Sequence, residues 1–270
     1  MTDIKRALVV GATGNIGRIA VGLLREQGVQ VRGLARNAHG LPSGAEAISA
    51  DVRDLNALRA AADDVDAVVL IWPFMSAGGI DEVAPVLARP GRRIAYVSAM
   101  HVRDDRSPDQ NGVWGQVEAA IRATGADWTF LRASGFATNT LQWAPAIRAG
   151  DPVRIPYVRA ARSLIHERDL AESAVAAVTS PAFAGRSYVL SGPSAVTQEE
   201  QVRLLGGVAL EISADQARAA MDPGFADSAL PYWASLVDNP EPVADGVREL
   251  TGHGARTFAQ WATDHAADFR

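Results

Sequence analysis

Short apolar runs alternate with segments of helical periodicity along the first half of the chain. The run at 4–10 leads directly into residues with helical spacing, and 66–71 is continuously apolar, as in a strand buried on both faces of a parallel sheet. Further strands are predicted at 29–36, 46–50, 93–98 and 128–132, and helices at about 54–61 and 113–123. This alternation predicts an α/β fold built on a Rossmann-like doubly wound parallel sheet, with ligands at the carboxyl ends of its strands.

The pattern changes after Arg132. Residues 133–157 are irregular and rich in aromatic residues and prolines, and they are followed by a predicted helix that begins at Asp169 and a predicted strand at 186–190. We therefore expect a dinucleotide-binding domain at 1–132. The C-terminal region at 133–270 would form a small α+β substrate lobe and complete the fold.

A glycine-rich turn joins the first predicted strand to the first predicted helix. Its glycines are Gly11, Gly14 and Gly17. In this context Gly11 permits the tight turn, Gly14 lets the backbone approach a pyrophosphate, and Gly17 lets helix and strand pack closely. The free amides at the start of the helix would bind the anion. The alternative is an ordinary glycine-rich turn, but the strand before it and the helix after it favour a phosphate site.

Arg36 stands at the end of the second predicted strand, where a fold that specifies NAD carries an acidic residue for the ribose 2'-hydroxyl. Between Ile4 and Ala45 the only acid is Glu26, which lies inside the first predicted helix. A guanidinium suits a phosphate better than a hydroxyl, so the sequence favours NADP(H) over NAD(H). The alternative is a solvated surface arginine.

Composition narrows the classes of partner. The net charge of −5 and the pI of about 5.6 offer no general attraction to nucleic acid or to an anionic membrane. Cysteine is absent, no apolar run is long enough to span a bilayer, and the histidines show no metal-ligand spacing. We expect a cytoplasmic monomer or homodimer that binds a small-molecule substrate, with neither metal nor flavin.

Several motifs together resemble one family. They are the 11–17 turn, Gly33–Asn37, Asp51–Val52, Tyr96–Ser98, Trp128–Arg132 with Gly135–Phe136, Ile165–Ala171, Leu190–Pro193 and Arg256–Trp261. The set is similar to the NmrA-like, NAD(P)H-binding branch of the atypical short-chain dehydrogenase/reductase superfamily, and it spans nearly the whole chain. Members of that branch include quinone and azo reductases, other small-molecule reductases and nucleotide-sensing regulators.

The resemblance implies particular cofactor contacts. It implies that the pyrophosphate is held by Gly11, Thr13, Asn15 and Ile16. It also implies that Arg36 binds the 2'-phosphate and that Asp51 and Val52 lie at the adenine. The ribose and nicotinamide would be flanked by Ile71, Trp72 and Pro73, with Ser98 near the nicotinamide.

The chain departs from its relatives at the proton relay. Typical short-chain dehydrogenases place a tyrosine and, four residues later, a lysine on one face of the helix after the fifth strand. Alignment of that helix on Glu118 puts Gln110 and Trp114 at those positions, and the only lysine in the chain is Lys5. The usual relay of alcohol dehydrogenation is therefore missing.

Aromatic residues suggest a flat substrate pocket. Its candidates are Trp72, Phe74, Met75, Trp114, Phe136, Trp143 and Tyr157, which would stack against a planar ligand. An equally weighted interpretation makes Trp114 and Trp143 buried core anchors.

Few side chains are available as proton donors. His101 follows the fifth predicted strand and titrates near neutrality, and Tyr157 lies in the irregular segment. Ser98 would orient substrate or nicotinamide, since a serine without a nearby base is not a nucleophile. We expect His166 to have a structural role beside a helix start, and Tyr96 to be part of the core.

Glu118 and Arg132 are charged residues near the expected site. Glu118 and Arg122 have the spacing of an ion pair on a helix surface. Arg132 either faces the cleft to bind an acidic substrate group or pairs with an acid in the core.

The sequence therefore favours an NADPH-dependent reductase of a small conjugated or aromatic acceptor, either quinone-like or a carbonyl compound. Two alternatives remain open. One is a non-catalytic NADP(H)-binding redox sensor, and the other is a biosynthetic isomerase or dehydratase on the same fold.

Overall fold

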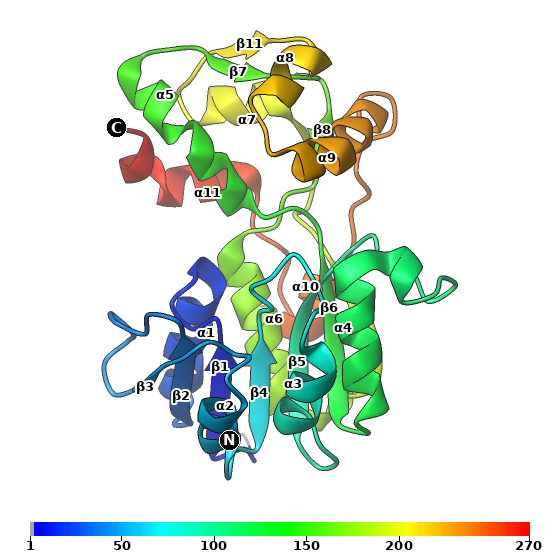
Figure 1. Ribbon diagram of the computed structural model, residues 1–270. Helices are drawn as coiled ribbons and strands as arrows, with labels where there is room; N and C mark the ends of the chain where they lie inside the picture. The colour runs from blue at the N-terminus through cyan, green and yellow to red at the C-terminus, as the bar shows by residue number, and fades with distance from the viewer. Residues whose placement is uncertain (1–2) are drawn as a thin grey trace. The chain divides into compact units, whose positions relative to one another are not determined.

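The computed structural model describes residues 3–270, and these form two compact units (Figure 1). The first, which we call the sheet unit, contains the chain up to Ala133 together with Glu167–Leu190 and Gly246–His253. The second unit contains Ser134–His166, Ser191–Asp245 and Gly254–Arg270. Segments from the second half of the chain thus belong to the sheet unit.

The sheet unit is built on seven parallel strands in the order β3-β2-β1-β4-β5-β6-β9. Their bounds are β1 Arg6–Val10, β2 Gln30–Ala35, β3 Glu46–Ser49, β4 Ala67–Leu70, β5 Arg93–Ala99, β6 Asp127–Ala133 and β9 Arg186–Leu190. The strand order reverses at β1, which is the hallmark of a doubly wound sheet. The predicted fold class is therefore confirmed.

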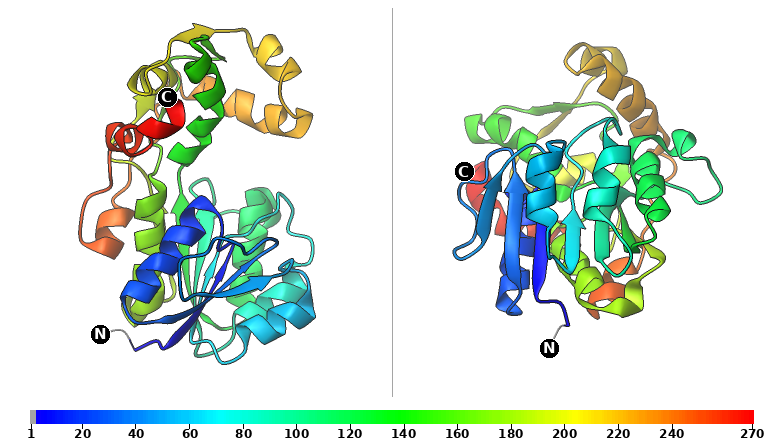
Figure 2. Two further views of the ribbon diagram at one scale, coloured as in Figure 1. Left: turned by 90° about the vertical axis from the view of Figure 1, so that its left-hand side faces the viewer. Right: turned by 60° about the horizontal axis from the view of Figure 1, so that its bottom comes forward.

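Helices cover both faces of this sheet, as the edge-on view in the left panel of Figure 2 shows. The helices of the sheet unit are α1 Asn15–Glu26, α2 Leu55–Ala62, α3 Ile80–Leu87, α4 Gly112–Ala123, α6 Glu167–Thr179 and α10 Gly246–Thr251, with short 3-10 turns at Asp109–Asn111 and Pro181–Phe183. Helices α1, α6 and α10 pack together on one face, and α2, α3 and α4 pack together on the other. This arrangement explains why the central strands are apolar on both sides.

One core of the sheet unit lies between the sheet and α2–α4. Alternate residues of the central strands point into it, among them Leu8, Val68, Ile94 and Phe130, all at most 1% exposed. Val83 and Leu87 of α3 and Val117 and Ile121 of α4 close it from the helix side.

Arg92 is a buried cation that connects the ends of α2 and α3. Its guanidinium donates hydrogen bonds to the carbonyls of Ala62 at the end of α2 and of Val86 and Leu87 at the end of α3. Burial lowers the pKa of Arg92 to about 10, so the group remains a cation at neutral pH. A cation at two helix carboxyl termini compensates their negative ends.

The second unit is a mixture of short helices and strands. Its elements are η2 Ala137–Trp143, α5 Ala144–Ala149, β7 Val153–Ile155, β8 Ala161–Arg162, β10 Val196–Thr197, α7 Gln198–Leu204, β11 Ala209–Glu211, α8 Ala214–Ala219, α9 Pro223–Ser235, α11 Phe258–Asp264 and η4 Ala266–Phe269. Strand β7 pairs with β11 in parallel, and β8 pairs with β10 in antiparallel. Trp143, Phe258 and Trp261 form the centre of its main core.

Two helices differ from the sequence expectation. Helix α6 begins at Glu167 and not at Asp169, so Asp169 lies buried inside the first turn instead of capping it. Helix α3 was not predicted, because it is only eight residues long and contains Pro85. Within residues 3–270, none of the helices is long and apolar enough to cross a membrane.

The turn between β1 and α1 depends on close backbone packing. Gly11 has φ of +80°, and its N–H and that of Ala12 both donate to the carbonyl of Leu34 on β2, at 2.9 and 3.2 Å. A Cβ atom on Gly17 would lie 2.2 Å from the Gly11 carbonyl oxygen. The structure thus explains why positions 11 and 17 carry glycine.

We expect Gly17→Ala to lower the free energy of unfolding by about 1–3 kcal/mol, because the added methyl group overlaps backbone atoms that have little room to move. Gly22→Ala in the same helix is the control. No atom lies within 4 Å of its Cβ position, so this change should stabilise the protein by about 0.5–1 kcal/mol. Urea unfolding of both variants tests this claim. Equal free energies of unfolding for the two variants would contradict it.

Candidate functional site

The amino terminus of α1 is open to an anion. Its cap position, Gly14, offers no side chain, and the first turn holds no acidic residue. The first amides of a helix lack acceptors within the helix, and they carry its positive end. Gly14 and Asn15 are exposed, so a ligand can reach these amides, while Ile16 and Gly17 are buried against the sheet.

Two further side chains lie beside this turn. Arg18 donates from Nη2 to the carbonyl of Thr13 at 3.3 Å, which brings a positive charge next to the turn. Ile71, the residue after β4, lies close to Gly11, because a Cβ on Gly11 would be 3.2 Å from the Ile71 Cβ. The structure therefore brings the predicted pyrophosphate residues and Ile71 together at the carboxyl edge of the sheet.

A second group of charges lies at the carboxyl ends of β2 and β3. Arg36 follows β2, is exposed, and forms no hydrogen bond or ion pair within the described residues. Asp51, just after β3, accepts from Arg53 Nε at 3.2 Å, and Val52 is buried in the core. The hydrogen bonds from Arg53, with Arg36 also contributing, lower the pKa of Asp51. Arg36 thus presents free donors at the strand end where a 2'-phosphate binds in this fold.

The segment after β4 folds back on itself. Trp72 donates from Nε1 to the carbonyl of Ser76 at 2.9 Å, and its ring meets Phe74 edge to face at 5.1 Å. The guanidinium of Arg53 lies 3.8 Å from the centre of the Phe74 ring. Met75 is 79% exposed and Pro73 is also exposed. The cation–π contact therefore joins the segment after β3 to the segment after β4.

The expected surface ion pair between Glu118 and Arg122 is wrong in its main feature, because Glu118 is only 3% exposed. Its carboxylate accepts from Arg132 Nε and Nη2, at 3.1 and 2.8 Å, and from the hydroxyl of Ser98 at 2.6 Å. Arg122 approaches it only to 4.0 Å. Of the two interpretations of Arg132, pairing with a core acid is the one observed.

This buried network also holds the loop after β5. Arg132 donates from Nη2 to Asp104 at 2.7 Å, and Arg122 donates to the same carboxylate at 3.1 Å. The hydrogen bond from Arg132 lowers the pKa of Asp104. Buried Asn111 donates to the carbonyls of Arg103 and Arg106 and accepts from the Arg103 N–H. Sequence reasoning missed the contacts of Asp104 and those of Asn111, because neither set follows from local spacing.

His101 lies at the start of this ordered loop. Its ring meets Trp114 edge to face at 4.9 Å, so the two predicted site residues are in contact. Partial desolvation by its neighbours, with a smaller effect of Arg106, lowers the pKa of His101 from its usual value, although the residue is exposed. This shift favours the neutral imidazole, whose N–H is a neutral donor.

The second unit places its predicted site residues in different surroundings. Trp143 is 9% exposed in the main core, which favours the core-anchor interpretation. Tyr157 packs beside a smaller cluster with Leu230 and Trp233, and its backbone has φ of +54°. Phe136 is half-buried beside the bridge to Ile165.

Two residues assigned structural roles are buried as expected. His166 lies 3.3 Å from a carboxylate oxygen of Asp264, and Tyr96 is fully enclosed in the core. Burial, with Glu118 nearby, raises the pKa of Tyr96. Neither side chain is exposed to a ligand.

Asp169, Glu172 and His253 bring possible metal ligands close together, a grouping that histidine spacing did not reveal. Glu172 already accepts from Arg168 Nε at 2.9 Å, and the imidazole of His253 lies 3.0 Å from its other oxygen. Ion pairing accounts for the position of the Glu172 carboxylate.

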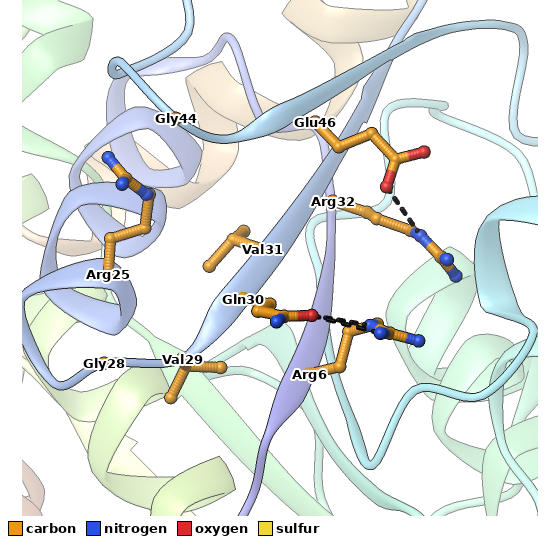
Figure 3. Close-up of a pocket in the computed structure, with 9 residues that line it drawn as sticks. All are labelled: Arg6, Arg25, Gly28, Val29, Gln30, Val31, Arg32, Gly44 and Glu46. Atoms are coloured by element: carbon orange, nitrogen blue, oxygen red, sulfur yellow. Dashed lines mark hydrogen bonds and ion pairs between the residues drawn. The ribbon is translucent and has the colours of Figure 1, made fainter.

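A hollow of about 400 Å³ lies at the other edge of the sheet (Figure 3). It is lined by the amino-terminal residues of three strands, Arg6, Gln30 and Glu46, and by Arg25 at the end of α1. In this hollow Arg6 donates a hydrogen bond to Gln30, and Arg32 donates one to Glu46. This hollow is distinct from the glycine-rich turn between β1 and α1, which lies at the carboxyl ends of the strands.

We expect Glu118→Gln to lower the free energy of unfolding by about 3–5 kcal/mol, because it leaves the buried Arg132 guanidinium without its main partner. The control is Asp105→Asn, which removes an exposed ion pair with Arg103 and should cost less than about 1 kcal/mol. Chemical denaturation of the two variants gives the comparison. Similar losses would show that the buried network contributes no more than a surface pair.

Comparison with known proteins identifies the family. The NAD(P)H-binding family model matches residues 11–181. A (4-alkanoyl-5-oxo-2,5-dihydrofuran-3-yl)methyl phosphate reductase from Streptomyces griseus is 35% identical, covering 97% of this chain and 98% of that protein. An NAD(P)H azoreductase from Xenophilus azovorans is 31% identical with the same coverage of each chain.

Solved structures share the fold at lower identity. An NADPH complex of an Escherichia coli quinone oxidoreductase has a TM-score of 0.77 at 21% identity, covering 96% of this chain and 99% of that one. An NADP(H) complex of a Citrobacter triphenylmethane reductase also has a TM-score of 0.77, at 18% identity and the same coverage. The match over most of the sheet unit and the two full-length relatives confirm the inference from the motifs: the chain belongs to the NAD(P)H-binding family.

Proposed function

We propose that the protein is an NADPH-dependent reductase of a small conjugated acceptor. The observation that carries the proposal is the pairing of an open helix amino terminus with an exposed, unpaired arginine one strand away. The first suits a pyrophosphate and the second a 2'-phosphate.

The residues of the turn fit such a dinucleotide. The Gly14 backbone is exposed, and a Cβ there would already stand 3.3 Å from the Gly11 carbonyl oxygen. The turn with Thr13, Asn15 and Ile16 would bind the pyrophosphate. Asp51 and Val52 would lie at the adenine, and Ile71, Trp72 and Pro73 near the ribose and nicotinamide. Bound NADPH would supply a hydride to the acceptor.

The polar groups near the expected nicotinamide limit the choice of acceptor. The Ser98 hydroxyl donates its hydrogen bond to Glu118, so its oxygen can only accept a hydrogen bond from a ligand. The lowered pKa of His101 favours its neutral form, which is a weak acid. An acceptor whose reduced form is a stabilised anion has little need of an acid from the protein. Quinones and carbonyl-conjugated alkenes meet this condition.

The named relatives support this class of acceptor. One is named for a dihydrofuranone that carries an alkanoyl group and a phosphate ester, and the other for azo compounds. Both are conjugated electron-poor molecules. Half-buried Phe74 and Trp114, with exposed Met75, are the sheet-unit side chains that we assign to such a ligand. In the second unit, Phe136 and Tyr157 remain candidates, and Tyr157 could also donate a proton.

The rival is an NADP(H)-binding sensor without turnover, and a cofactor-retaining isomerase or dehydratase is a further alternative. NADPH oxidation followed at 340 nm against a panel of quinones, azo dyes, unsaturated lactones and aldehydes separates these. We expect turnover with conjugated acceptors and little with simple aldehydes. Tight NADPH binding with no turnover above the protein-free rate would support the sensor.

Arg36→Ala should weaken NADPH binding by about 10- to 100-fold, because it removes charge-assisted hydrogen bonds to the 2'-phosphate. NADH binding should change little. Arg59→Ala, an exposed arginine on α2, serves as the control and should affect neither. Calorimetric titration of each variant with both cofactors gives the answer, and equal losses for NADPH and NADH would refute the assignment.

A further inference from the structure

Arg162, at the end of β8 in the second unit, has an unusual environment for a guanidinium. Its side chain is 17% exposed, yet its buried Nε has no hydrogen-bond partner within residues 3–270. Its one polar contact there joins Nη2 to Glu241 at 3.5 Å, which is long for a hydrogen bond. Its Nη1 also makes no hydrogen bond within the described residues and, unlike Nε, is not sealed from solvent.

Glu241 does not satisfy Arg162 because it is held elsewhere. One carboxylate oxygen accepts from the Ser163 N–H at 2.8 Å and from the Ser163 hydroxyl at 3.1 Å. The other accepts from the hydroxyl of Tyr232. These partners fix a buried carboxylate at a distance that the guanidinium reaches only weakly. A hydrogen-bond acceptor is thus missing from a largely buried cation, which is a costly arrangement.

The backbone nearby leaves room for this guanidinium. A Cβ on Gly135 would lie 2.0 Å from Arg162 Nη2 and 2.6 Å from Cζ, so any larger residue would displace the side chain. Gly135 stands two residues after the last residue of β6. In doubly wound folds, ligands bind where the chain leaves the carboxyl ends of the strands.

We propose that Arg162 binds a small acidic ligand, a carboxylate or a phosphate ester. The Nη1 and Nη2 end of the guanidinium offers two parallel donors that match either anion, and the Glu241 carboxylate competes with the anion for Nη2. This inference goes beyond the proposed reductase function and concerns the second unit alone. It assigns the second unit a charge-selective role separate from cofactor binding.

Titration calorimetry with phenyl phosphate, benzoate and uncharged benzyl alcohol tests the proposal on protein saturated with NADP⁺. Saturation occupies the dinucleotide turn, so the probes do not bind there. We expect one or both anions to bind and the alcohol not to bind. A preference between the two anions identifies the acidic group.

Arg162→Gln should weaken anion binding by about 10- to 100-fold, whereas Arg159→Gln, an exposed arginine of the same unit, should leave it unchanged. Glu241→Gln keeps an oxygen for Ser163 but removes the competing charge, so it should tighten anion binding several-fold. This gain would be informative even if the Arg162 variant folded poorly.

Equal anion affinities in wild type and Arg162→Gln, or no anion binding at millimolar probe concentrations, would overturn the inference. In either case NADP⁺ binding and the reduction of an uncharged quinone are measured on the same samples. Their retention would show that the reductase function stands without the anion site, and their loss in the wild type would show that the reductase proposal itself had failed.

Discussion

The contact between Gly17 of α1 and the carbonyl of Gly11 is the constraint on which the rest of the sheet unit depends. Because no Cβ fits there, the helix begins directly against β1. The same turn donates two hydrogen bonds to Leu34 of β2, which ties the turn after β1 to the neighbouring strand. Close packing and anion binding are therefore one feature, since the geometry that excludes a side chain also leaves the first helix amides uncovered.

The sequence predicted what depends on local periodicity. The seven-stranded sheet follows from apolar runs, and its strand at 186–190 was located to the residue. The short α3 was missed because a proline and few residues give little periodic signal. Spacing of four made Glu118 and Arg122 look like a surface pair, whereas Ser98 and Arg132, 20 and 14 residues away in sequence, are the partners that bury Glu118. Contacts between a helix and the strands on which it packs cannot be deduced from spacing along the helix.

The Glu118 network also changes the chemistry expected of this helix. In typical relatives the exposed face of this helix supplies a tyrosine and a lysine. Here the helix turns an acid inward, where it fixes Ser98 and Arg132. Arg132 in turn holds Asp104 and, through it, the loop that begins at His101. The polar atoms of this region thus organise the loop, which agrees with our proposal of acceptors that stabilise their own negative charge.

Charge in this protein acts over short distances. A net charge of −5 gives no long-range attraction to a polyanionic dinucleotide or to an acidic substrate. Binding must therefore come from donors in contact with the ligand, and we propose the first amides of α1, Arg36 in the sheet unit and Arg162 in the second unit for this role. Arg36 is exposed and gains little until a phosphate desolvates it, whereas Arg162 is already largely desolvated and lacks acceptors. A buried, under-coordinated arginine gains more per hydrogen bond from an anion than a solvated one does, so the anion site that we propose in the second unit would select its ligands by charge.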